Sequence, residues 1–135
     1  MKRSTLMAYQ WITGAADTLT GILLYVAPDF TLRMMGVHAP ADAMPYVGYI
    51  GAFVLSVGLA CVYGALLVRA CACVERIETV WILTGFTRAA VAVYVLQAVV
   101  TGKLAAGWMS VVLFDGACVL VQGIGLRRKW LKDAK

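Results

Sequence analysis

Four long apolar segments constrain the fold of this chain more than any other feature. They cover about residues 6–27, 45–68, 79–100 and 104–126. A transmembrane helix needs about 20 mainly apolar residues to cross the hydrocarbon core of a bilayer. Lipid offers no partner to backbone N–H and C=O groups, so each segment must satisfy its own hydrogen bonds as an α-helix. We therefore expect an all-α integral membrane protein.

The composition agrees with burial in lipid. The 135 residues are 62% hydrophobic and 14% charged, whereas a soluble domain is about half apolar and about a quarter charged. This length predicts a single domain over residues 1–135. The short breaks after the second and third segments favour antiparallel neighbours, as in a four-helix bundle.

The basic residues predict the orientation. If the N-terminus is inside, the inner side holds nine of them: Lys2, Arg3, Arg69, Arg76, Arg127, Arg128, Lys129, Lys132 and Lys135. The outer side then holds two, Arg33 and Lys103. Basic residues favour the cytoplasmic side, so both termini should be cytoplasmic. They flank apolar segments and form no single basic face, which predicts contact with membrane lipid and argues against nucleic acid.

The first segment begins like a signal peptide, with Met1, Lys2 and Arg3. Its apolar region is too long, however, and it carries Asp17, so we expect it to stay in the mature protein. The longest outer loop follows this segment. Apolar residues alternating with polar ones over residues 29–35 predict a short helix lying in the interface.

Three of the four segments carry a charge near their middle: Asp17, Arg88 and Asp115. Each lies 10 to 15 residues from the next charged residue on either side, which is roughly 15–20 Å along a helix. A charge at this depth costs at least ~2.5–3.5 kcal/mol, so such residues face the bundle interior and find partners. The forked guanidinium of Arg88 suits a position between two carboxylates.

Other polar or aromatic residues recur at helical spacing on each segment. We predict that they line a polar cavity around the charges and bind a ligand: Gln10, Thr13, Tyr49, Ser56, Tyr63, Thr84, Trp108 and Gln122. Glycines also recur within the segments, and small residues allow helix backbones to approach closely in lipid.

The charge balance suggests chemistry. Two ionised carboxylates and one guanidinium leave a net charge of −1, so one carboxyl should be protonated or the site should bind a cation. Asp17, Arg88 and Asp115 are therefore candidate catalytic residues for acid–base chemistry, of the isomerase or cyclase type, on a small amphiphilic molecule. Alternatively, the charges only fix helix register.

Two further functions stay open. The chain could be a non-enzymatic accessory or assembly subunit of a larger membrane complex, or a proton-coupled transporter or channel acting as an oligomer. No cofactor is expected. Cys71 and Cys73 are close in sequence, but two thiolates without a nearby histidine make a poor metal site.

Several short motifs resemble those of a family of small bacterial four-helix membrane proteins of unknown function, and more loosely the DoxX-like group. They comprise Ala27-Pro28, residues 32–37 and 46–51, Arg88 and Asp115, within about residues 10–128. The resemblance implies a four-helix fold in the bacterial cytoplasmic membrane and implies no particular activity.

Overall fold

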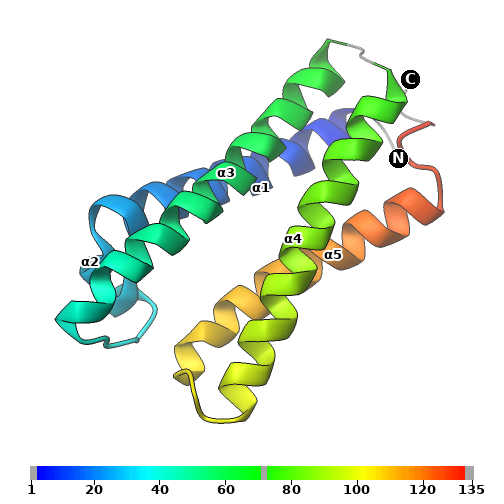
Figure 1. Cartoon of the computed structure of the whole chain (residues 1–135). Helices are drawn as coiled ribbons and strands as arrows, with labels where there is room; N and C mark the ends of the chain where they lie inside the picture. The colour runs from blue at the N-terminus through cyan, green and yellow to red at the C-terminus, as the bar shows by residue number, and fades with distance from the viewer. Residues whose placement is uncertain (1–2, 71–72, 133–135) are drawn as a thin grey trace.

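The computed structural model describes residues 3–70 and 73–132, and within these ranges it contains helices and no strand. The all-α prediction is confirmed. The elements, labelled in Figure 1 where there is room, are α1 (Arg3–Val26), α2 (Pro28–Met34), the 3-10 turn η1 (Ala41–Ala43), α3 (Met44–Arg69), α4 (Val74–Val100), the 3-10 turn η2 (Ala106–Trp108) and α5 (Met109–Arg127).

Three stretches are long and apolar enough to cross a membrane: Ala41–Arg69, Val74–Val100 and Ala106–Arg127. Their outer surfaces agree with this, since Phe86 is 72% exposed and Leu113 is 69% exposed. The helix α1 is also long, at 24 residues, but Gln10, Asp17 and its threonines make it more polar. Its crossing of the membrane stays a prediction.

Two helices begin at other residues than the predicted spans do. The helix α4 begins at Val74, five residues before the predicted span, because the intervening Glu and Arg residues are good helix formers. The helix α5 begins at Met109, five residues later than predicted, because a turn containing Gly102 (φ 72°) and η2 comes first. The short helix expected at residues 29–35 is α2. Cys71 lies outside the described residues, and with it the Cys71–Cys73 pair.

The helices pack as two antiparallel pairs. The helix α1 packs mainly on α3 and α4 mainly on α5, while α3 also contacts α4 (Figure 1). Glycines make the first pair tight. A Cβ atom on Gly58 would collide with the backbone of Thr18, and one on Gly21 would collide with that of Leu55. The predicted close packing through glycine is confirmed for this pair.

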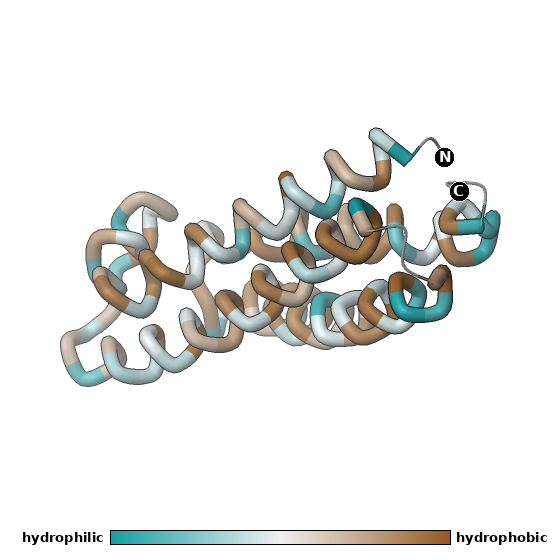
Figure 2. The backbone as a smooth tube through the Cα atoms, turned by 90° about the horizontal axis from the view of Figure 1, so that it is seen from above, coloured by the Kyte–Doolittle hydropathy of each residue, from teal (hydrophilic) through white to brown (hydrophobic). Residues whose placement is uncertain are grey.

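Hydrophobic side chains form one cluster at each end of the bundle. The terminal-end cluster consists of Leu6, Leu67, Val68, Val74, Ile77, Trp81 and Leu131. The loop-end cluster consists of Leu24, Leu32, Val37 and Val47, with Trp108 packed against it. Figure 2 shows hydrophilic residues gathered beyond the terminal end, where α1 begins and α5 ends. The charged residues of the sequence prediction lie between the two clusters.

Candidate functional site

Arg88 on α4 lies between Asp17 on α1 and Asp115 on α5. Its Nη1 donates to Asp115 Oδ1 at 2.6 Å, and its Nη2 donates to Asp17 Oδ2. Three helices thus contribute to one pair of charge-assisted hydrogen bonds, which are stronger than neutral ones. The predicted pairing is confirmed, and we call these three residues the charged cluster.

The charged cluster is closed on most sides. The side chain of Arg88 is 2% exposed, that of Asp17 is 9% exposed and that of Asp115 is 14% exposed. Arg88 Nη2 also lies 3.8 Å from Cys61 Sγ on α3, and the guanidinium carbon lies 5.4 Å from the centroid of the Phe114 ring on α5. Arg88 therefore contacts all three other long helices.

Both carboxylates retain hydrogen-bonding capacity. Each bonds Arg88 through a single oxygen, Oδ2 of Asp17 and Oδ1 of Asp115, whereas an ionised carboxylate has two oxygens and about four lone-pair sites. The second oxygens can bind a proton or accept from another donor. Asp115 is the most exposed member of the charged cluster.

A second buried polar layer lies closer to the terminal end, seven residues from the aspartate on α1 and on α5 and four residues from Arg88 on α4. Gln122 Nε2 donates to Thr84 Oγ1 at 2.9 Å, and Gln10 is fully buried. Each glutamine amide fits against a glycine. A Cβ atom on Gly64 would collide with the amide of Gln10, and one on Gly85 would lie 3.2 Å from Gln122 Oε1. The structure thus brings Gln10, Thr84 and Gln122 toward the bundle interior, as predicted.

Thr13 is buried as well, but its hydroxyl is occupied locally. It donates to the backbone oxygen of Tyr9 at 2.9 Å. Trp108 lies at the loop end, half-buried against the hydrophobic cluster there, and so away from the charged cluster. Its spacing of seven residues from Asp115 indicates a shared helix face, which is not enough to bring the two side chains together.

The expectation that Tyr49, Ser56 and Tyr63 face the bundle interior is wrong. They share one face of α3, but that face points outward: Tyr49 is 64% exposed and Tyr63 is 52% exposed. The hydroxyl of Ser56 donates to the backbone oxygen of Phe53. The opposite, glycine-bearing face of α3 packs on α1, and this packing turns the tyrosines away.

Sequence reasoning missed three neighbours of the polar layers, namely Cys61, Trp81 and Phe114. Trp81 is fully buried, packs with its ring centroid 5.5 Å from that of Tyr9, and has an Nε1 atom without a hydrogen-bond partner. It lies seven residues before Arg88, so the helical repeat could have found it. Cys61 and Phe114 carry no comparable signal.

Comparison of the chain with protein-family models, with curated proteins and with solved structures gives no match. The resemblance inferred from short motifs therefore stays a prediction. The functional argument depends on the geometry of the charged cluster.

Proposed function

We propose that this chain is a four-span protein of the bacterial cytoplasmic membrane, with both termini cytoplasmic, that binds a small amphiphilic molecule at the charged cluster. The observation that carries this proposal is the pairing of two carboxylates with one guanidinium, deep between the two hydrophobic clusters. Charged groups within a membrane are costly and mark functional sites by default. The second carboxylate adds a negative charge that one guanidinium does not balance.

The surplus carboxylate gives the charged cluster a chemical capacity. With one proton bound it holds a carboxylic acid, a carboxylate and a guanidinium, so its net charge is zero. The acid could donate a proton to the ligand while the carboxylate accepts one, and an isomerisation or cyclisation would then leave the total proton count unchanged. Arg88 would stabilise whichever carboxyl is ionised.

Neutralising Asp115 tests this function. Asp115→Asn keeps the size of the side chain and an oxygen that accepts from Arg88 Nη1. We expect the parent protein at pH 7 to show one protonated carboxyl in infrared difference spectra, and Asp115→Asn and Asp17→Asn each to remove it, because Arg88 then balances the one carboxylate that remains. The control Asp29→Asn changes an exposed carboxyl on α2 and should leave the band in place.

Ligand binding needs its own measurement. Organic extracts of protein purified in mild detergent should contain one small molecule in stoichiometric amount, and the Asp115→Asn extract should lack it while the variant remains folded. Two results together would contradict the proposal: both carboxyls ionised at neutral pH with no bound cation, and the same extract from the parent and from Asp115→Asn. The charged cluster would then only hold the helices in register.

The outward stripe of α3 favours a second candidate function, that of an accessory subunit in a larger complex. Tyr49 and Phe53 stack edge to face with ring centroids 4.9 Å apart, and Tyr63 continues the same face. Aromatic residues are enriched at interfaces. Stoichiometric partner proteins after purification in mild detergent would favour this function.

Proton transport by an oligomer is the third candidate, and vesicles containing the protein would have to show proton flux that depends on Asp115.

A further inference from the structure

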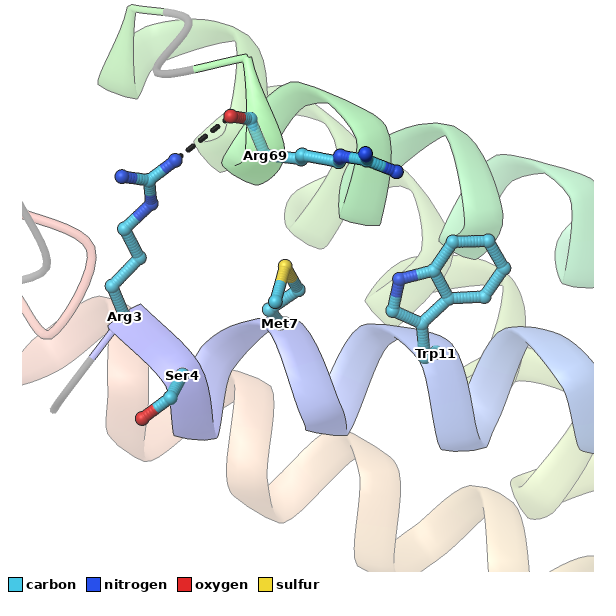
Figure 3. A pocket seen from close by; sticks show the side chains of 5 residues that line it. All are labelled: Arg3, Ser4, Met7, Trp11 and Arg69. Carbon is cyan, nitrogen blue, oxygen red and sulfur yellow. Dashed lines mark hydrogen bonds between the residues drawn. The ribbon is translucent and has the colours of Figure 1, made fainter.

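A shallow groove opens on the outside of the bundle where α1 begins and α3 ends. It has a volume of about 390 Å³ and is lined by Arg3, Ser4, Met7, Trp11 and Arg69 (Figure 3). The charged cluster is a separate feature, because Asp17 lies 14 residues beyond Arg3 on α1, which is roughly 20 Å along the axis. We call this feature the Arg3–Arg69 groove.

Arg3 is held in place by the end of α3. Its Nη2 donates to the backbone oxygen of Arg69 at 2.8 Å, and its Nε donates to that of Val68 at 3.2 Å. These carbonyls are among the last of the helix, which lack a partner within it. A guanidinium has five N–H donors, so these two bonds leave three donors of Arg3 for other partners.

Arg69 supplies a second guanidinium. In Figure 3 its side chain extends from the end of α3 toward Trp11, with Met7 lying between Arg3 and Trp11 on α1. The ion pairs found among residues 3–70 and 73–132 are formed by Arg33 and Arg88. Within those ranges, neither Arg3 nor Arg69 has a carboxylate partner, so no described residue balances the two positive charges of the groove.

The floor of the groove changes from charged to apolar along α1. Arg3, Met7 and Trp11 are spaced four residues apart and so form one stripe. The stripe runs from the polar end of the bundle toward the membrane interior over roughly 12 Å. Trp11, which is 42% exposed, has the amphipathic ring typical of the membrane interface. This sequence of groups matches a molecule with an anionic head and an apolar tail.

We propose that the Arg3–Arg69 groove binds one anionic phospholipid, with its anionic head group on the guanidiniums of Arg3 and Arg69 and an acyl chain on the apolar surface of Met7 and Trp11. Guanidinium forks bind phosphate oxygens in pairs, and basic pockets between membrane helices bind anionic head groups. Further basic residues at this end add long-range attraction: Arg76, Arg127, Arg128, Lys129 and Lys132. The site does not depend on the function proposed for the charged cluster.

Native mass spectrometry of the delipidated full chain in mild detergent tests this site. Phosphatidylglycerol should bind as a single tight adduct, and phosphatidylcholine of the same acyl chains should bind several-fold more weakly. Arg69→Gln should weaken phosphatidylglycerol binding about five-fold, since one basic residue near an anionic head group contributes about 1 kcal/mol. The matched control is Arg76→Gln, which removes the same charge from an exposed residue at the same end of the bundle, outside the groove.

The outcomes separate a site from general attraction. Equal binding of the two lipids to the parent protein would overturn the proposal. This comparison needs no variant, so it holds even if Arg69→Gln does not fold. Equal weakening by Arg69→Gln and Arg76→Gln would show diffuse electrostatics. Competition by glycerol phosphate at concentrations similar to those of the lipid would show a phosphate site in which the acyl chain has no part.

Discussion

Arg88 is the residue on which the balance of buried charge depends, because it is the partner of both Asp17 and Asp115. Arg88→Leu would leave two carboxyls without their partner. Breaking a buried ion pair costs about 3–5 kcal/mol, so we expect a much lower melting temperature in detergent. Adding Asp17→Asn and Asp115→Asn to Arg88→Leu should restore most of the loss, since the stranded charges are then removed.

The matched control for this series is Arg33→Leu. Arg33 pairs with Asp29 at 2.7 Å on the surface of α2, and both side chains are more than half exposed. Exposed pairs of this kind contribute little to stability, so the melting temperature should hardly change. If Arg88→Leu melted as the control does, the pairing of Arg88 with the aspartates would not hold the helices together.

The charged cluster could be predicted from the sequence, whereas its neutral neighbours could not. Three charges at one depth of a membrane have only each other as strong partners. The free-energy cost of an unpaired charge in the membrane therefore predicts that they pair. Cys61 and Phe114 incur no such cost at that depth and could face lipid or protein equally well. Their contacts with Arg88 follow from the packing of α3 and α5, which single residues do not specify.

At the scale of helices, the glycines of α1 and α3 decide which faces meet. Gly58→Ala would place a methyl group against the backbone of Thr18, which cannot move as a side chain can. Overpacking of this kind costs about 1–3 kcal/mol, so we expect a lower melting temperature. Gly123→Ala on α5 is the control, because a Cβ atom there meets nothing within 4 Å. Equal melting of the two variants would contradict the tight α1–α3 pair.

The same glycines explain the main error of the sequence interpretation. The helix α3 offers two distinct faces, one with Gly51 and Gly58 and one with Tyr49, Ser56 and Tyr63. The hydroxyl groups of the second face led to the prediction that it faces the bundle interior. The close approach of α1 requires the first, because only small residues let two backbones come this near. Which face is buried depends on the partner helix, and the pattern within α3 alone does not reveal it.

For the whole molecule, the order of the helices brings the basic residues to one end. The start of α1, the end of α3, the start of α4 and the end of α5 all meet there, as the terminal-end cluster shows. Reporter fusions after Pro40 and Lys135 should report opposite sides, outside and inside, because three candidate spans separate these positions. The same side for both would contradict the three crossings.

The fusions do not test α1, which is more polar than the three candidate spans, so the N-terminus needs a separate label. A small tag before Met1 should react with an impermeant label only after the membrane is permeabilised. It would then lie on the cytoplasmic side, as a fusion after Lys135 should. The reason is depth: Asp17 is buried and pairs with Arg88 from α4, and this pairing predicts that α1 passes through the same membrane plane as α4. A fusion after Gly102, in the turn after α4, is the control and should report outside.

If the tag were accessible from outside while the fusion after Pro40 also reported outside, α1 would lie along the membrane surface. Asp17 could not then share mid-membrane depth with Arg88, and the four-span arrangement would fail together with the charged cluster.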